Sequence, residues 1–456
     1  MKRNILHHVW REFLCLLSAA FLPMFAQANS GSTLTLQQAI RIGVEQNTSI
    51  LQTQYNVRAS EAAVSAAYGN LLPNVNVSMG WNRNQVDRRF TYIPNVGYLP
   101  IPSKSITNSY TAGASSSLLL FNGFANTAAV SRAAANSLAS QYTLERTKQA
   151  VVYQVQAAYL NVLRTEQLVR VNAENLTRDS VQLVRSQEAN RVGSVAIADV
   201  YRWEVQVAND QYNLVQAQNN YAKAKADLLA LLSLDVTGNY TILDSSIVID
   251  IDTSEFAATN ARYRDFSRLY EEALSNRPDY KGAIESVNAA SSSVTIARSG
   301  YFPSVSAFVQ QGLNSDIFSI TGLTDNRSLF WGLSIQWSLF DRLQTNNQIQ
   351  SAKASLGIAE EQLAQTQRQI QSDLKKALLD LDAAEKQYVA SVKGVQSASL
   401  DRKTAEERYI LGAGTILDLT TANANYVLAL TNKINAAYTY IDAKNKLDFV
   451  LGINHY

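Results

Sequence analysis

Cysteine and histidine are nearly absent from this chain. The single cysteine, Cys15, lies in an apolar stretch near the N-terminus, and the only histidine beyond residue 28 is His455. Beyond residue 28 the protein has no disulfides, so packing or assembly must hold it together. This part offers no catalytic cysteine or histidine base, no soft-donor metal site, no glycine-rich phosphate loop and no nucleophile elbow. The sequence predicts no enzyme activity, no metal and no cofactor.

An excess of charge and a long hydrophobic run are also missing. The chain has 40 Lys and Arg against 38 Asp and Glu, and residues 1–28 hold the small basic excess. Without a basic excess to neutralise phosphates, nucleic-acid binding is disfavoured. Beyond residue 28 no apolar run reaches the roughly eighteen residues that a membrane-spanning helix needs. If the protein crosses a membrane, we expect it to do so with strands.

Residues 1–28 predict a secretory signal peptide. Positive charge in "MKRN" precedes the apolar run "FLCLLSAAFLPMF", and Ala26-Gln27-Ala28 fits a cleavage site of small residues. Glu12-Phe13-Leu14 before Cys15 is not a lipoprotein signal, so no lipid anchor is expected. We therefore expect an exported protein.

Proline and glycine are scarce where they would interrupt helices. Residues 104–277 and 304–456 contain no proline, and residues 124–192 contain no glycine. Both proline-free regions are rich in Ala, Leu, Gln, Glu, Lys and Arg, which favour helix. A helix over residues 124–190 would be roughly 100 Å long, which no compact domain requires. The composition therefore predicts long helices in an elongated molecule.

The chain contains an internal duplication. An apolar heptad stripe near 152–176 is interrupted at Glu166 and Ser180, and a second stripe near 374–395 is interrupted at the equivalent positions, Glu385 and Ser399. Matching interruptions support duplication more strongly than matching stripes. The 3.5-residue period indicates helices packed side by side as in coiled coils. The same offset relates Leu120-Phe121 to Leu339-Phe340, and Tyr221, Ala224 and Leu228 to Tyr440, Ala443 and Leu447.

The duplication divides the chain into the signal peptide (1–28), a first structural repeat (29–232), a linker (233–266) and a second repeat (267–456). The first repeat is predicted to contain a helix at 36–69, strands at 73–83 and 107–121, and helices at 123–190 and 199–232. The second is predicted to contain a helix at 267–299, strands at 303–313 and 328–340, and helices at 342–409 and 418–451. We expect a mainly α fold with a membrane β part, and a mixed linker with a short β run.

The segment 328–340 alternates between a face of small or polar residues and an apolar face, which consists of Leu329, Trp331, Leu333, Ile335, Trp337 and Leu339. This pattern predicts a strand with one face toward lipid and the other toward water. Four strands cannot close a barrel, and lipid does not tolerate open strand edges, so several chains must contribute. Two chains would give eight strands around a filled interior, and three would give twelve with room for water. The alternative is a soluble sandwich in which the tryptophans are core residues.

The order of elements and two helix-to-helix turns, "RVGSVAIADV" (191–200) and "RYILGAGTILDL" (408–419), resemble the TolC-like outer-membrane efflux channels. The resemblance covers essentially the whole chain after residue 28. It implies a homotrimer with a twelve-strand β-barrel in the lipid of the Gram-negative outer membrane. A twelve-helix α-barrel would continue it across the periplasm, with a small mixed α/β equatorial region. It also implies a passive exit duct of a tripartite efflux pump, with a periplasmic adaptor protein and an inner-membrane pump as partners.

The resemblance places the two turns at the periplasmic tip, where the pore narrows and adaptors dock. It implies a pore gate that contains Asp199, Asp418, Tyr409 and Thr421. It implies docking turns that contain Arg191, Gly193, Gly412 and Gly414. In a trimer Asp418 would form a ring of three carboxylates, which favours cations. A simpler interpretation of the turns is that each glycine ends one helix and each aspartate starts the next.

Three other functions compete with the efflux duct. A type I protein-secretion exit duct would use the same architecture. A structural coiled-coil surface stalk fits the long helices but has no use for a lipid-facing strand. An autonomous porin is disfavoured because ordinary porins have short periplasmic turns instead of long helices.

Overall fold

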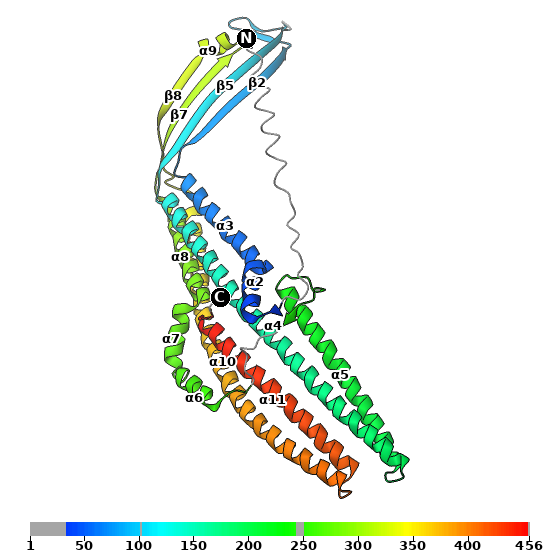
Figure 1. The fold of residues 1–456 in the computed structure, drawn as a ribbon. Helices are drawn as coiled ribbons and strands as arrows, with labels where there is room; N and C mark the ends of the chain where they lie inside the picture. The colour runs from blue at the N-terminus through cyan, green and yellow to red at the C-terminus, as the bar shows by residue number, and fades with distance from the viewer. Residues whose placement is uncertain (1–32, 101–102, 243–249, 455–456) are drawn as a thin grey trace, which may run out of the picture.

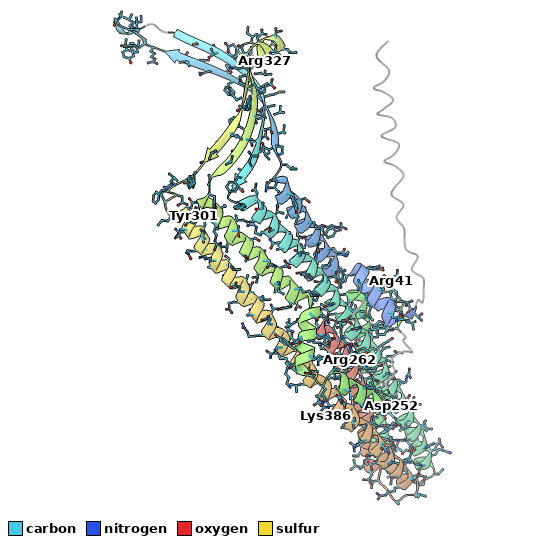
Figure 2. The ribbon with its side chains drawn as sticks, turned by 90° about the vertical axis from the view of Figure 1, so that its left-hand side faces the viewer. Arg41, Asp252, Arg262, Tyr301, Arg327 and Lys386 are labelled. Carbon is cyan, nitrogen blue, oxygen red and sulfur yellow. The ribbon has the colours of Figure 1, made fainter. Side chains whose placement is uncertain are left out.

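The computed structural model describes residues 33–100, 103–242 and 250–454 of the chain. The molecule is elongated, with a four-stranded sheet at one end and long helices that run from it to two hairpin turns at the other end (Figure 1). Tyr301 lies where the helices meet the sheet, and Arg327 lies toward the far end of the sheet (Figure 2). The predicted signal peptide and His455 lie outside the described residues.

The sheet is antiparallel, with the strand order β2-β5-β7-β8. Its strands are β2 (Asn74–Arg88), β5 (Ser103–Asn122), β7 (Ser304–Ser315) and β8 (Arg327–Gln336). β2 and β5 run past the expected limits at 83 and 107, because their pairing continues without a break to the far end of β2. A small hairpin of β3 (Thr91–Ile93) and β4 (Gly97–Leu99) follows β2, and helix α9 (Ile320–Asp325) connects β7 to β8.

The strand register sorts the side chains onto two faces, because residues paired across strands project to the same side. One face is mainly apolar, and one of its rows consists of Val75, Ser116, Val309 and Trp331. The opposite face is mainly small or polar, and one of its rows consists of Ser78, Gly113, Gly312 and Ser328. The alternation read along one strand is therefore a property of the whole sheet.

The two long helices, α4 (Ala125–Arg191) and α10 (Gln344–Ile410), contain 67 residues each. At roughly 1.5 Å per residue each is roughly 100 Å long. Both follow a residue with left-handed backbone, Phe124 (φ 69°) and Leu343 (φ 64°), and both precede a glycine with positive φ, Gly193 and Gly412. The members of each pair occupy equivalent positions in the two repeats. The repeat seen in the sequence is therefore also a repeat of backbone geometry.

Each long helix packs against the helix that follows it, α5 (Ile197–Leu231) or α11 (Ile416–Leu451). In the half of the molecule nearer the turns, the helices lie side by side in the order α5, α4, α11, α10 (Figure 1). In the half nearer the sheet, the order is α3, α4, α8, α10 (Figure 1). The helices therefore form a four-membered wall along their whole length.

The helices expected at 36–69 and 267–299 are each split in two. The first consists of α2 (Leu36–Gln46) and α3 (Thr48–Gly69), and the side chain of Asn47 between them accepts the Ser49 N–H to cap α3. The second consists of α7 (Phe266–Asn276) and α8 (Pro278–Arg298). Arg277 between them is extended, as the residue before a proline prefers to be.

The heptad stripes supply the core. Val155, Tyr159 and Val162 of α4 are fully buried in one cluster, and Leu374 and Tyr388 of α10 are buried in another. The linker contains the strand β6 (Thr241–Ile242) and the helix α6 (Thr253–Arg262). β6 pairs in parallel with β1 (Thr33–Leu34). A short 3-10 turn, Ser299–Tyr301, leads from α8 into β7. Among the described residues, no helix has both the length and the hydropathy needed to cross a membrane.

Candidate functional site: the helical tips and the apolar face of the sheet

The two helix-to-helix turns end their long helices in the same way. After α4, the N–H groups of Ser194 and Gly193 donate to the carbonyls of Ala189 and Asn190, both at 2.9 Å. The equivalent bonds around Gly412, after α10, are 2.8 and 3.1 Å long. This Schellman arrangement places a left-handed residue at the position of each glycine, and φ is 78° at Gly193 and 71° at Gly412. Both glycines therefore serve to reverse the chain.

Asp418 starts α11 through a capping box with Thr415. The Asp418 carboxylate accepts the Thr415 N–H at 3.0 Å, and the Thr415 hydroxyl accepts the Asp418 N–H at 3.2 Å. The backbone hydrogen bond from Thr415, its side-chain bond and the charge of Arg408 lower the pKa of Asp418. The carboxylate is exposed and ionised at neutral pH. Asp418 thus both starts a helix and carries a negative charge at the tip.

Asp199 occupies the equivalent position in the first turn but makes different contacts. Its carboxylate forms an ion pair with Arg202, one turn further along α5, at 3.1 Å. The residue before this helix is Ala196, whose side chain cannot cap it. Among the described hydrogen bonds, none joins Asp199 to Tyr409, another residue of the expected gate. The two aspartates are therefore not equivalent.

A small apolar cluster joins the two hairpins near the tip. Trp203 of α5 is fully buried against Ile416 and Leu419 of α11, and Tyr409 of α10 packs at the edge of the cluster. Trp203 was not predicted from the sequence. A comparison of the repeats could have singled it out, because the equivalent position of the second repeat is a small residue, Ala422. Tyr409 thus packs against both hairpins within one protomer.

The other residues expected at the tip lie on its surface. The exposed ones are Arg191, Gly193, Gly412 and Thr421, and Gly414 is half-buried. Arg191 forms a surface ion pair with Glu188 at 2.8 Å. A Cβ added to Gly414 would lie 3.2 Å from the Arg408 Cβ, so the second turn is tight there. The fold brings both sets of residues to neighbouring turns at one end of the molecule (Figure 1).

The apolar face of the sheet is the second candidate site. The β8 side chains on this face are highly exposed in one chain, with 64% exposure for Leu329, 78% for Trp331, 67% for Leu333 and 70% for Ile335. Val75, Val77, Met79 and Trp81 extend this surface onto β2 and are also exposed. A continuous apolar surface of this kind marks an interaction with another protein or with a membrane.

Trp337 and Leu339 lie past the end of β8, which stops at Gln336 instead of continuing to 340. Both side chains are exposed. The Trp337 indole donates to the Tyr301 carbonyl at 3.1 Å, at the junction of sheet and helices. An amphipathic ring at such a boundary is typical of a membrane interface.

A buried polar stripe on α4 was not identified from the sequence. Its members, spaced three or four positions apart, are Asn175, Asp179, Gln182 and Ser186. This spacing places them on one face of the helix. The polarity of this stripe contrasts with the apolar stripe that fills the core nearer the sheet.

Comparison with known proteins decides the family. The profile described as "Outer membrane efflux protein" matches residues 40–233 and 269–453, well over half of the chain. The chain belongs to this family. The two matched segments correspond to the two repeats, which confirms the resemblance noted from the turns and the order of elements.

Curated members of the outer membrane efflux proteins align with nearly the whole chain. The outer membrane efflux protein BepC of Brucella suis is 23% identical over 420 residues, which cover 92% of this chain and 87% of that protein. Outer membrane protein TolC of Vibrio cholerae is 24% identical over 432 residues, which cover 92% of each chain.

Solved structures agree with this fold. The outer membrane protein VceC from Vibrio cholerae has a TM-score of 0.77 at 17% identity, and the match covers 91% of this chain and 96% of that one. The CmeC outer membrane channel of Campylobacter jejuni has a TM-score of 0.77 at 16% identity, covering 92% and 86%. The protein is thus an outer membrane efflux protein, the exit duct of an efflux pump, and its helical part extends into the periplasm.

Proposed function

We propose that this outer membrane efflux protein works as a homotrimer. Three sheets would close into a twelve-strand β-barrel in the outer membrane, and three helical walls would close into a twelve-helix α-barrel through the periplasm. The observation that carries the proposal is that each protomer has unpartnered edges on the same two sides along its whole length.

The first unpartnered edges are strands. β2 and β8 each have a neighbour on one side only. Lipid offers no hydrogen bonds to a free strand edge, so β2 of one protomer must pair with β8 of the next. Two protomers would give eight strands around an interior filled by side chains, whereas three give twelve and an aqueous bore. A duct requires the second arrangement.

The second unpartnered edges are helices. α5 ends the wall on one side and presents an exposed apolar stripe of Ile197, Tyr201, Val205, Tyr212 and Val215. α10 ends it on the other side and presents Ile358, Leu379 and Leu400, which are also exposed. Apolar stripes at coiled-coil spacing are buried against a partner helix. In the trimer α5 of one protomer packs against α10 of its neighbour.

The two faces of the sheet then have different surroundings. The apolar face, which includes Leu333 and Trp331, contacts membrane lipid, and the face of small and polar residues lines the bore. Trp337 lies at the boundary between the membrane and the periplasm. This assignment accounts for the high exposure of the apolar side chains in one chain.

At the tip, the two turns of each protomer surround the narrowest part of the pore. Three Asp418 carboxylates form an acidic ring there, and Asp199, Tyr409 and Thr421 lie around it. The exposed turn residues Arg191, Gly193 and Gly412, together with Gly414, form the docking surface for a periplasmic adaptor protein. An inner-membrane pump supplies the cargo, and the duct conducts it passively. The name of a relative from Pseudomonas putida, "Antibiotic efflux pump outer membrane protein ArpC", supports a role within a pump.

Two experiments test the assembly and the docking surface. Light scattering of the detergent-solubilised protein, corrected for bound detergent, should give three times the mass of one chain. A stable monomer that retains its β-sheet would contradict the trimer. A photo-crosslinking amino acid at Arg191 should capture the adaptor in cells, and the same probe at Lys353, exposed on α10 near the sheet, should not.

A further inference from the structure

Two carboxyl groups are buried against each other in the first helical hairpin. Asp179 of α4 is 0% exposed and Asp210 of α5 is 4% exposed. We name these two residues the acid pair. Asp179 lies about three helical turns, or roughly 18 Å, before Arg191, the last residue of α4. Aspartates are almost never fully buried without a partner, so the pair needs an explanation.

The acid pair requires a proton. Its two carboxyl groups lie close enough for each to affect the pKa of the other through a hydrogen bond. Two ionised carboxylates could not form such a bond, because both can only accept. One oxygen of Asp179 accepts from the Asn423 amide at 3.3 Å, and one oxygen of Asp210 accepts from the Gln206 amide at 3.1 Å. The Oδ2 atoms of both aspartates have no donor among the described residues. A single shared proton satisfies both of them.

A metal ion fits this place less well than a proton. Within the part of the chain that the structure describes, no group of three or more histidine, cysteine, aspartate or glutamate side chains is placed to hold a metal. The amides around the acid pair, from Asn423 and Gln206, turn their N–H donors toward the carboxyl oxygens. Donors of this kind stabilise a negative charge and compete with a cation for the same oxygens.

The charges around the acid pair do not neutralise it. On α4, Arg178 is the cation that acts on both carboxyl groups. α11 contributes the uncharged Asn423. Across the Tyr426 ring, 5.8 Å from Arg178, lies Arg402 of α10, which is itself paired with Glu406 at 3.3 Å. One nearby arginine can balance one carboxylate, and the second carboxyl group is left to a proton.

Electrostatics agrees with this geometry. Burial raises the pKa of Asp179 to about 7, and the hydrogen bond with Asp210 and the charge of Asp210 add to the effect. Burial also raises the pKa of Asp210, although the bond to Asp179 lowers it. The proton therefore resides on Asp179, which donates it to Asp210.

The second repeat provides an internal comparison. Its positions equivalent to the acid pair hold Ala398 and Ala429. The second hairpin, α10 with α11, has the same length of long helix and the same turn geometry without these carboxyl groups. A hairpin of this fold therefore does not need an acid pair, and only the first hairpin carries one.

We propose that the acid pair is a proton-binding site that sets how tightly the first hairpin packs together and against α11. With the proton bound, the pair carries one negative charge that Arg178 balances. When the proton is lost, two carboxylates repel each other in the buried contact between α4 and α5. Asp179 is then a buried negative charge beside α11, where only the uncharged Asn423 faces it. The first hairpin then loosens near the tip, and the second does not.

The direction of the pH dependence follows from the raised pKa of Asp179. A carboxyl group whose pKa is raised by folding contributes stability that is complete at acid pH. This contribution declines as the pH rises toward about 7 and is absent above it. The first hairpin should therefore be more tightly closed at pH 6 than at pH 8.

Hydrogen exchange of the assembled protein in detergent, at pH 6 and pH 8, tests the inference. After correction for the intrinsic pH dependence, peptides from 175–215 should open about tenfold more at pH 8, the ratio that a pKa near 7 gives. Peptides from 394–434 should not change. Asp179→Asn keeps a donor toward Asp210 and should abolish the difference, and the double variant Asp179→Ala, Asp210→Ala imitates the second repeat. Asp382→Asn, an exposed aspartate on α10, should behave as the unmodified protein.

The inference fails if both hairpins respond alike, or if Asp179→Asn keeps the pH response. Should these variants not assemble, infrared spectroscopy of the unmodified protein decides. A protonated carboxyl band that disappears between pH 6 and pH 8 supports the proton site, and absence of that band at pH 6 overturns it. These readouts are independent of the trimer and of the gate.

Discussion

At the scale of single residues, the glycine and the aspartate of each tip turn have different roles. Gly193 and Gly412 reverse the chain through left-handed backbone. Asp418 starts the next helix through its bonds to Thr415, whereas Asp199 pairs with a side chain instead. A substitution of a tip glycine therefore tests the backbone conformation of the turn, and a substitution of a tip aspartate tests the charge.

Asp418 allows charge and capping to be separated. We expect Asp418→Asn and Asp418→Ala both to reduce cation selectivity and cation block in single-channel recordings, because both would remove the acidic ring that we propose. Only Asp418→Ala should also weaken the start of α11, because alanine cannot accept the Thr415 N–H. The effect of the charge should fade at high salt. If Asp418→Asn conducts like the unmodified channel, the aspartate only starts a helix.

Gly412 tests the backbone of the proposed docking turn. Its φ of 71° is unfavourable for a β-branched residue, so Gly412→Val should distort the turn at a cost of about 1–3 kcal/mol. We expect efflux in cells to fall while the purified channel still conducts. Gly394→Val is the matched control, because a Cβ at Gly394, within α10, meets nothing within 4 Å. Normal efflux by Gly412→Val would remove this residue from the docking surface.

At the scale of elements, the sheet works through the separation of its faces. Leu333 pairs with Ala307 on the apolar face, and Ser334 pairs with Ser306 on the polar face. Neighbours in one strand thus have opposite surroundings, although only one peptide bond separates them.

Two adjacent substitutions test this separation. Leu333→Arg should place a charge in lipid and destabilise the folded barrel by about 2–4 kcal/mol near the membrane midplane. Ser334→Arg should face water, leave assembly intact and change the conductance. Resistance of the folded protein to denaturant, measured in lipid vesicles, distinguishes the two. Equal damage from both would show that the faces are assigned wrongly.

At the scale of the whole molecule, the proposed trimer makes the protomer one part of a closed wall. Its exposed apolar stripes on α5 and α10 lie at opposite ends of the helical wall, and its free strands β2 and β8 lie at opposite ends of the sheet. In the proposed trimer, neighbouring chains bury the apolar surface that a soluble domain would bury within one chain. Stability and assembly should therefore be inseparable.

A charge on the α5 stripe tests the proposed contact between protomers. Val205→Glu should bury a carboxylate in that contact at a cost of several kcal/mol per chain, which is enough to weaken the trimer. Gln211→Glu adds the same charge at another exposed position of α5, away from the stripe, and should be tolerated. Native mass measurement across a detergent series checks both variants. If the two trimers are equally stable, α5 does not form the contact.

Much of this architecture could be predicted from local sequence patterns. The long helices, the duplication and the two-faced strands follow from periodicities that repeat over short stretches of chain, and such periods survive whatever the chain packs against. The turn glycines follow from the backbone conformation that a helix reversal needs. Pro278 was also a local signal, and the continuous helix expected at 267–299 overlooked it.

Other features depend on contacts between distant segments. Pairing across the sheet decided how far β2 and β5 extend and where β8 ends, because a strand ends where the neighbouring strand no longer pairs with it. The burial of Trp203 depends on α11, which belongs to the other repeat. The alternation along the chain says which side of a strand is apolar, and only the assembled sheet says that four such strands share one face.

The sequence by itself determined the elements and their repetition, since both are local. The tertiary structure alone decided that Asp179 and Asp210 lie in contact, one on each arm of a hairpin, with Asn423 of a third helix closing the site. A charged side chain in a helix ordinarily faces water. Whether it is buried depends on which helix covers it, and a single helical period contains no information about that neighbour.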